Sequence, residues 1–375
     1  MSIRRVTVVG LGLIGGSVAL AAARTPGVLV RGVDPDAETL GYALEHGMVA
    51  EAASPEDAAA RGWFSEHISD LVVLAAPVTA TLGWLDHLAE LGYTGIVTDV
   101  ASTKAAIVEL AEAHRGAFRF VGGHPMAGSE RSGVAAATAT LFDGVYYILT
   151  PAASTDMDAY RKVHAFVTSL GARVVSVEAP AHDEAVAIVS HVPHVAAAAL
   201  VELASERAGS AGADLLRLAA GGFKDMTRIA AGSPELWTGI CLENAGAVES
   251  GLAGLERVLA EFRGHVAAGD ADAVRAWLAR PADVRRSLPA QWVPATTRLT
   301  ELLVPVTDRP GVVGIVTTAA SRAGCNIEDI EIDHQSEDSA VLRLVLTDEG
   351  DVEKLAADLV ASGFEPILRP LEEEA

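Results

Sequence analysis

The sequence predicts an α/β protein built from three consecutive domains. In the first part of the chain, short apolar, β-branched segments alternate with longer alanine-rich segments, a pattern typical of a parallel sheet covered by helices. The strand pattern stops near residue 180, where long alanine- and leucine-rich stretches begin, and a βαββαβ order follows from residue 298. We therefore expect an α/β domain at 1–178, an all-helical domain at 179–285 and a small ferredoxin-like domain at 298–372.

Length, composition and charge limit the class of protein. A chain of 375 residues is too long for a single core, and its hydrophobic content of 50% excludes a disordered protein. The 50 acidic residues outnumber the 28 basic ones, which gives a formal net charge of −22. Such a field repels nucleic acid and anionic membrane surfaces, so we expect neither as a partner. An anionic substrate would need a local cationic group.

Two stretches without charged residues approach the length of a membrane span, at 6–23 and 185–201. The first is rich in glycine and is better explained as strand, turn and helix. The second carries His191, Pro193 and His194 near its middle, which a lipid-facing helix would tolerate poorly. No secretory signal precedes the first strand, and 2 cysteines are too few for a disulfide framework. We expect a cytoplasmic protein.

In the first domain, strands should alternate with helices. The expected strands lie at residues 4–9, 29–33, 71–75, 96–100, 120–121, 146–149 and 173–177. The last two flank a helix at 157–170. This alternation favours right-handed βαβ units and a parallel sheet.

A G-x-G-x-x-G pattern between the first strand and the first helix indicates a Rossmann-type nucleotide site. It is formed by Gly10, Gly12, Leu13, Ile14 and Gly15. The first glycine permits a tight turn, the second lets the backbone approach a pyrophosphate, and the third allows helix and strand to pack closely. The alternative is that these glycines only make a turn.

Asp34 lies about 20 residues beyond the fingerprint, where an acid can bond the ribose 2′-hydroxyl. A carboxylate there would repel a 2′-phosphate, which favours NAD over NADP as the cofactor. Asp34 could instead be only a helix N-cap. Ala76 and Pro77 directly follow the strand at 71–75, and we assign them to the same cofactor site.

His124 is the candidate general base, because imidazole can accept a proton near neutral pH. Pro125 pushes it towards extended geometry, and we expect it just past the strand at 120–121, where ligands bind in open α/β sheets. A structural histidine remains the alternative. Ser102 follows the strand at 96–100 and could be a helix N-cap or a catalytic hydroxyl. Lys104 is interpreted as a solvated residue of the first helical turn.

The helical domain carries two further motifs. Ser190 to His194 reads Ser-His-Val-Pro-His in an apolar run, and at least one of its imidazoles should face a polar cavity. The sequence supplies no further ligands for a metal, so we expect none. Arg228 is the candidate anion-binding group, although it could be a surface arginine paired with Asp225 or Glu235. The alanine-rich helices favour a homodimer.

The C-terminal domain should follow a proline-containing linker at 280–297. We expect strands and helices in the order βαββαβ. The strands are expected at 300–306, 326–333, 339–346 and 365–369, and the helices at 312–323 and 352–362. A turn, Asp308-Arg-Pro-Gly311, should join the first strand to the first helix.

Together these motifs resemble the prephenate/arogenate dehydrogenase family over nearly the whole chain. The resemblance rests on the glycine fingerprint, the Asp99–Lys104 segment, the His124–Glu130 segment (His-Pro-Met-Ala-Gly-Ser-Glu), Ser190–His194, and Asp225–Arg228 with Trp237. The C-terminal domain resembles an ACT domain, with Asp308–Gly311 as its ligand-side turn and Gly324–Ile327 before its second strand. No chorismate mutase segment is present, which implies a monofunctional form.

The resemblance implies an activity and a role for each motif. The activity is NAD-dependent oxidative decarboxylation of prephenate to 4-hydroxyphenylpyruvate, with His124 as the base and Ser102 orienting it. Arg228 would hold the ring carboxylate, Ser190 and His194 would lie near the substrate side chain, and Asp225 and Trp237 would support them. Ser129, which is threonine in some relatives, and Glu130 would border the entrance. Tyrosine would be the effector, bound by Asp308, Gly311, Asn326 and Ile327.

Three other functions remain open on the sequence. An arogenate dehydrogenase would give tyrosine directly, and one charge in the pocket could decide between the two substrates. A β-hydroxyacid dehydrogenase would use a lysine of the helical domain, for which Lys224 is the candidate. A non-catalytic sensor would bind NAD and an amino acid without turnover.

Overall fold

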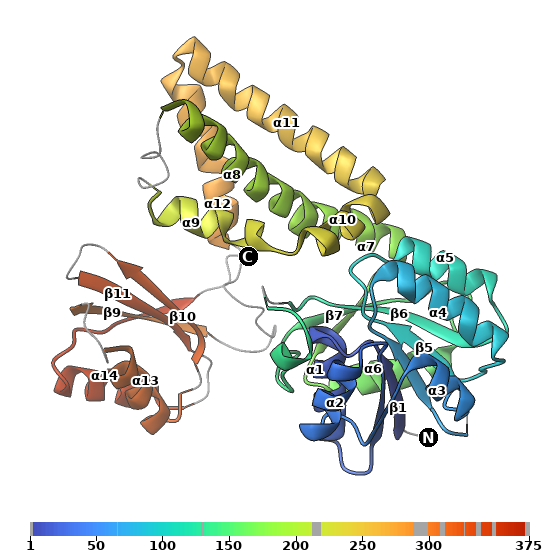
Figure 1. Ribbon diagram of the computed structural model, residues 1–375. Coiled ribbons are helices and arrows are strands. Elements are labelled where there is room, and N and C mark those ends of the chain that lie inside the picture. The colour runs from blue at the N-terminus through green and yellow to red at the C-terminus, as the bar shows by residue number, and fades with distance from the viewer. Residues whose placement is uncertain are drawn as a thin grey trace. The chain divides into compact units, whose positions relative to one another are not determined.

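A computed structural model describes residues 3–65, 67–128, 131–211, 219–287, 299–307, 312–325, 327–334, 339–346 and 350–371 (Figure 1). The chain divides into two compact units, Met1–Leu259 and Ala260–Ala375. The first unit holds the large sheet and most of the helical segment, and the second holds the C-terminal sheet.

An eight-stranded sheet in the order β3-β2-β1-β4-β5-β6-β7-β8 forms the centre of the first unit. Its strands are β1 (Arg5–Val9), β2 (Leu29–Val33), β3 (Glu51–Ala53), β4 (Leu71–Leu74), β5 (Ile96–Asp99), β6 (Arg119–Pro125), β7 (Tyr146–Thr150) and β8 (Arg173–Ser176). The expected Rossmann-type sheet is confirmed. The short edge strand β3 was not expected from the sequence; it pairs with β2 in parallel.

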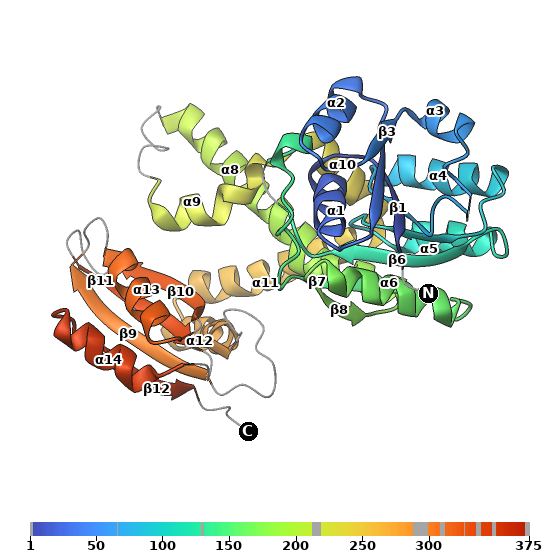
Figure 2. The ribbon, with the colours of Figure 1, turned by 90° about the horizontal axis from the view of Figure 1, so that it is seen from below.

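Helices cover both faces of this sheet, as Figures 1 and 2 show, because successive strand residues point to opposite faces. Val6 and Val8 pack on one face, whereas Val9 packs on the other. On the Val6 face lie α1 (Leu13–Ala23), α2 (Ala37–Glu45) and α6 (Met157–Ser169). On the Val9 face lie α3 (Pro55–Ala60), α4 (Val78–Glu90) and α5 (Ala105–Ala113).

The sheet is not parallel throughout, which corrects the expectation from the sequence. Strand β6 pairs with β5 in parallel as far as Val121 and then pairs with β7 in an antiparallel register from Gly122 to Pro125. Between these strands, the described residues contain only a 3₁₀ turn, η1 (Val134–Ala136), rather than a crossover helix. Without a crossover helix, the chain returns beside β6 in the opposite direction.

The helical segment begins with one long apolar helix. The parts α7 (Ala179–Val186), η2 (a π-helix, Ala187–His191) and α8 (Val192–Ala211) follow one another directly. Among the described residues, the stretch Ala179–Arg207 is the one helix that is long and apolar enough to cross a membrane by length and composition alone. His182 and Asp183 on this helix are buried against the α/β domain, as described below.

Further helices follow this one along the chain. They are α9 (Gly221–Thr227), the 3₁₀ turn η4 (Arg228–Ala231), α10 (Pro234–Glu243), α11 (Ala245–Ala268) and α12 (Ala271–Ser287). A Cβ atom on Gly251 of α11 would lie 2.7 Å from Val192, so a glycine is needed at this contact. The expected linker from residue 280 is wrong in its first part, because α12 continues to Ser287 with Pro281 inside it.

The C-terminal unit confirms the expected βαββαβ order. Its elements are β9 (Leu299–Thr307), α13 (Val312–Arg322), β10 (Ile327–His334), β11 (Ser339–Leu346), α14 (Val352–Ala361) and β12 (Ile367–Leu371). The sheet order is β10-β11-β9-β12, and every pair is antiparallel. Ile327 pairs with Leu346. Asp308, Gly311 and Asn326 lie outside the described residues.

Candidate active site

The glycine loop after β1 has the shape that a bound dinucleotide requires. Gly10 has a φ of +90°, which favours glycine, and its N–H donates to the Val33 carbonyl at 2.7 Å. A Cβ atom on Gly15 would lie 1.9 Å from the Gly10 carbonyl oxygen, so this position must be glycine for helix and loop to pack. A Cβ atom on Gly12, at the start of α1, would meet no atom within 4 Å. No side chain caps α1 at Gly12, and the space beside it leaves room for a phosphate at this helix start, so the loop fits the cofactor.

Asp34 is held beside this loop and does not cap the next helix. Its carboxylate accepts hydrogen bonds from the Leu11 N–H at 2.8 Å and from the Asp36 N–H at 2.9 Å. The N-cap of α2 is Asp36, which accepts the Thr39 N–H. The alternative interpretation of Asp34 as an N-cap is therefore wrong, and its carboxylate stays next to the fingerprint.

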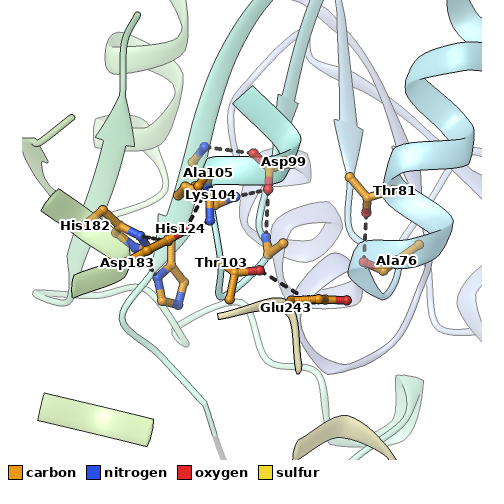
Figure 3. Close-up of polar contacts among 12 residues, drawn as sticks. Ala76, Thr81, Asp99, Thr103, Lys104, Ala105, His124, His182, Asp183 and Glu243 are labelled. Carbon is orange, nitrogen blue, oxygen red and sulfur yellow. Dashed lines mark hydrogen bonds and ion pairs between the residues drawn. The ribbon is translucent and has the colours of Figure 1, made fainter. Parts of the chain in front are cut away.

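Ala76 and Pro77 lie in the turn between β4 and α4. The Ala76 carbonyl accepts a hydrogen bond from the Thr81 hydroxyl at 3.0 Å, and Pro77 is the N-cap residue of α4 (Figure 3). A Cβ atom on Gly10 would lie 2.7 Å from the Ala75 carbonyl oxygen. This turn is thus in contact with the glycine loop, as its assignment to the same site requires.

His124 lies within strand β6 rather than just past its end. The strand continues through Pro125 because, beyond Val121, it exchanges β5 for β7 as its partner. His124 is 9% exposed, and it lies beyond the last residue that pairs with β5. The extended geometry expected before Pro125 is present, although the strand is longer than predicted.

The His124 ring belongs to a buried chain of hydrogen bonds (Figure 3). Its Nδ1 lies 2.8 Å from Nε2 of His182, whose Nδ1 lies 2.7 Å from the Asp183 carboxylate. Asp183 also accepts the backbone N–H groups of Lys104 and Ala105, each at 2.8 Å. The start of α5 is therefore capped by a carboxylate from the helical segment.

This arrangement corrects two expectations about the loop before α5. Ser102 is partly buried and does not cap the helix, because Lys104 occupies the N-cap position and makes no side-chain cap. Lys104 is not solvated: its side chain and that of Asp99 are both 0% exposed and form an ion pair. Burial lowers the pKa of Lys104, and Asp99 opposes that shift.

Asp99 joins this ion pair to the strand that carries His124. Its carboxylate also accepts the Gly123 N–H and the Ala101 N–H, each at 3.0 Å. A Cβ atom on Gly123 would lie 2.7 Å from the Asp99 carbonyl oxygen, so glycine permits this close approach. Asp99 thus holds the residue next to His124 in place.

The surroundings of His124 favour its neutral form. Burial lowers its pKa well below the usual 6.5, and the nearby Lys104, His182 and His191 lower it further. For Asp183, burial raises the pKa, but hydrogen bonds from His182 and from the backbone N–H groups of Ala105 and Lys104 outweigh that effect and leave it lowered. The site therefore combines a neutral imidazole with an ionised carboxylate.

The remaining histidines of the helical segment surround Trp237. The ring of His194 stacks on Trp237 with centroids 3.5 Å apart, and the buried His191 meets the same ring edge-on at 6.1 Å. Burial lowers the pKa of both histidines. Asn244 lies 3.4 Å from His191 and donates to the Asp183 carbonyl at 2.8 Å. The expectation that Trp237 supports this motif agrees with these contacts.

Other candidate residues are less closely connected to His124. Ser190 is partly buried in the π-helix η2, and Arg228 is exposed at the start of η4. Asp225 and Lys224 are exposed on α9. Ser129 and Glu130 lie outside the described residues.

The sequence analysis missed the residues that connect His124 to the helical segment. His182 and Asp183 are adjacent in sequence and follow directly on the expected start of the helical domain. The adjacent histidine and aspartate at the start of a long apolar helix could have marked them. For Lys104, the opposite charge of Asp99 five residues earlier could have indicated a buried ion pair.

A dinucleotide loop and a buried neutral histidine beyond the parallel strands of one α/β unit define a nicotinamide-dependent dehydrogenase. Residues 18–176 match the family described as "Prephenate dehydrogenase, nucleotide-binding domain", and residues 178–280 match "Prephenate dehydrogenase, dimerization domain". The chain belongs to the prephenate dehydrogenase family of NAD-dependent oxidoreductases of the tyrosine pathway.

Individual relatives agree with this assignment. The chain is 34% identical to the prephenate dehydrogenase of Bacillus subtilis (strain 168), over 91% of this chain and 92% of that protein. The crystal structure of A. aeolicus prephenate dehydrogenase in complex with hydroxyphenyl propionate and NAD+ has a TM-score of 0.69 and 31% identity, over 76% of this chain and 98% of that one. The crystal structure of Synechocystis arogenate dehydrogenase has a TM-score of 0.64 and 31% identity, over 75% of this chain and 99% of that one.

Proposed function

We propose that this enzyme oxidises and decarboxylates prephenate to 4-hydroxyphenylpyruvate. The observation that carries the proposal is His124, a buried imidazole that lies beyond the parallel part of a nucleotide-binding sheet and whose pKa is lowered by burial. A base for a hydroxyl proton must be unprotonated at the working pH, and burial achieves this here. The relative in Bacillus subtilis is a prephenate dehydrogenase, which supports the same substrate.

Each step of the reaction has a proposed residue. His124 accepts the proton of the ring hydroxyl while the carbon bearing that hydroxyl loses a hydride. NAD, when bound, supplies the hydride acceptor. The developing ketone then allows the ring carboxylate to leave as carbon dioxide, and the product ring is aromatic.

The roles of the other residues belong to the same proposal. Ser102 helps to orient His124, and Arg228 holds the ring carboxylate through its guanidinium. Ser190 and His194 line the pocket near the substrate side chain, and Ser129 and Glu130 border the entrance. The cofactor is held by Gly10, Gly12, Leu13, Ile14, Gly15, Asp34, Ala76 and Pro77.

The test is to follow reduced nicotinamide with prephenate and with arogenate, each with NAD and with NADP. We expect turnover with prephenate and NAD to be the fastest. A higher rate with arogenate would make the chain an arogenate dehydrogenase, as the Synechocystis relative is named. Equal rates would mean that it accepts both substrates, and no turnover with either would favour the sensor alternative.

The domain boundaries and the dimer are also proposals. We assign residues 1–178 to the nucleotide domain, 179–285 to the helical domain and 298–372 to a regulatory domain.

Large apolar side chains on the long helix are exposed, among them Ile188 at 57%, Val189 at 66% and Leu203 at 54%. Such a surface favours pairing with a second copy in the cytoplasm. Sedimentation equilibrium should give twice the chain mass.

The C-terminal domain is proposed to be an ACT domain that binds tyrosine. Its βαββαβ order and its sheet order support this assignment. Asp308, Gly311, Asn326 and Ile327 are the proposed contacts. Tyrosine should lower the rate with prephenate and raise the melting temperature; if it changes neither, this part of the proposal is wrong.

A further inference from the structure

The hydrogen bonds around His124 determine which of its nitrogens carries the proton. Asp183 is a carboxylate that already accepts two backbone N–H groups, so it accepts from His182 as well. A singly protonated His182 then carries its proton on Nδ1, which leaves its Nε2 as an acceptor. His124 lies 2.8 Å from that acceptor and must donate through its own Nδ1. Nε2 of His124 is thereby left unprotonated.

We propose that His182 and Asp183 form an orienting pair that holds His124 in the tautomer with a free Nε2 and stabilises the imidazolium formed during turnover. The inference rests on the proposed role of His124 as the base. His182 and Asp183 act through His124 and are positioning residues. Their role is that of the aspartate that orients the histidine in serine-protease triads, extended by one imidazole.

The charges packed around His124 explain why such a pair is needed. Lys104, from the loop before α5, opposes protonation of His124, and so do the charged forms of His182 and of His191 from η2. The carboxylate of Asp99 is already paired with Lys104 and with backbone N–H groups of its own loop and of Gly123. Asp183 is a second carboxylate, and it is connected to His124 through His182. It therefore offsets the positive charge that the base acquires.

The proton balance of the step is simple. The O–H bond of the substrate hydroxyl breaks, and an N–H bond forms at Nε2 of His124. The existing N–H at Nδ1 continues to donate to His182, so the new charge lies on a ring hydrogen-bonded towards Asp183. The electron pair of the C–H bond leaves as the hydride, which the proposed reaction already transfers to NAD.

Asp183→Asn is the most direct test, because an amide can turn its NH₂ group towards Nδ1 of His182. His182 would then carry its proton on Nε2 and donate it to Nδ1 of His124. The proton of His124 would therefore be on its Nε2. We expect kcat with prephenate to fall by about 10²–10⁴-fold, as in the analogous triad change, with the dissociation constant of NAD unchanged. Asp156→Asn is the matched control: Asp156 caps α6 by accepting the Ala159 N–H at 2.7 Å, away from this network.

Two substitutions of His182 separate orientation from packing. A glutamine at this position can accept from His124 through its oxygen and donate to Asp183 through its nitrogen, whereas a leucine can do neither. We expect His182→Gln to retain most of the turnover and His182→Leu to lose about as much as Asp183→Asn. Equal losses in the two His182 variants, with unchanged stability, would overturn the orienting role.

The tautomers can also be measured without any substrate. Ring ¹⁵N chemical shifts of protein labelled at its 11 histidines, with signals assigned from single variants, report which nitrogen of each ring is protonated. We expect protonated Nδ1 for His124 and His182 in the native enzyme, and protonated Nε2 for both in Asp183→Asn. A native His124 protonated at Nε2 overturns the inference. If the tautomers agree but neither prephenate nor arogenate is turned over, the proposed function fails and the orienting pair stands.

Discussion

The glycine loop and the network around His124 are built in opposite ways. The loop consists of residues 10–15 with Asp34, and its shape is set by the backbone: a positive φ at Gly10 and a close approach at Gly15. The network joins side chains from β5, β6, the loop before α5 and helix α7. One region is local in sequence, and the other exists only after the helical segment has packed against the sheet.

This difference predicts how each region responds to substitution. In the loop, a small change acts through sterics, either on the packing of α1 or on the approach of the cofactor. In the network, a change acts through charge and proton position, because buried polar groups there depend on one another. Binding of NAD and chemistry should therefore be separable by single substitutions.

The largest effect is expected from His124→Gln. Without a base, kcat with prephenate should fall by about 10²–10⁴-fold, since proton transfer contributes that much to catalysis. The dissociation constant of NAD, measured by calorimetry, should stay unchanged, because the glycine loop is intact. His164→Gln, on the exposed face of α6, serves as the control. A loss of NAD affinity equal to the loss of turnover would show that the two regions are not separable.

Lys104→Met should cause the largest loss of stability. It leaves the Asp99 carboxylate, which is 0% exposed, without its cation. Breaking a buried pair on one side costs about 3–5 kcal/mol of unfolding free energy, measured with denaturant. Arg275→Met, at an exposed pair with Asp272 on α12, is the comparison and should change stability little. If both variants unfold at the same denaturant concentration as the native protein, the Lys104–Asp99 pair contributes nothing to the stability of the folded protein.

The regions also differ in how far the sequence predicted them. The fingerprint, its strand and its helix were all expected, because glycine spacing and β-branched runs act through local backbone geometry. The strand Ser339–Leu346 was predicted with the bounds that the structure has. His124 and the Ser190–His194 motif were also identified, since histidines in apolar runs are conspicuous.

What the sequence did not predict depends on contacts between distant segments. Lys104 looks like a residue of a solvated first turn until Asp99 and helix α7 bury it. Asp183, 79 residues further along the chain, caps α5 in place of Ser102. Strand β7 runs antiparallel to β6, and the described residues between the two strands hold only the 3₁₀ turn η1 and no crossover helix. The sequence alone did not indicate that this connection lacks a crossover helix.

Two glycines of the loop separate cofactor binding from packing. Gly15→Ala forces a Cβ atom against the Gly10 carbonyl and should cost about 1–3 kcal/mol of unfolding free energy. Gly12→Ala meets no protein atom within 4 Å, so its stability should change by less than about 1 kcal/mol. Its dissociation constant for NAD should nevertheless rise about tenfold or more, because the methyl group lies where the pyrophosphate approaches. Unchanged NAD binding in Gly12→Ala would contradict the placement of the cofactor at this helix start.

The smallest effect is the dependence of stability on pH. The pKa of His124 is lowered well below 6.5 in the folded protein, so the unfolded chain binds this proton first as the pH falls. The contribution of neutral His124 to the free energy of unfolding is therefore fully present above about pH 6.5. It is lost below that pH, by up to about 1.4 kcal/mol per pH unit. Burial also lowers the pKa of His191 and of His194, so their contributions to stability are lost as the pH falls as well. The lowered pKa of Asp183 acts in a separate window, below its usual 3.8.

Denaturant unfolding at pH 7 and pH 5.5 measures this contribution. Between these values, His124→Gln should lose about 1 kcal/mol less unfolding free energy than the native protein, because glutamine does not titrate. Gly12→Ala, in the loop that holds no buried histidine, should lose as much as the native protein. An identical loss in native enzyme and His124→Gln would mean that His124 is protonated equally easily in the folded and unfolded chains, and so is not the neutral buried base that the network implies.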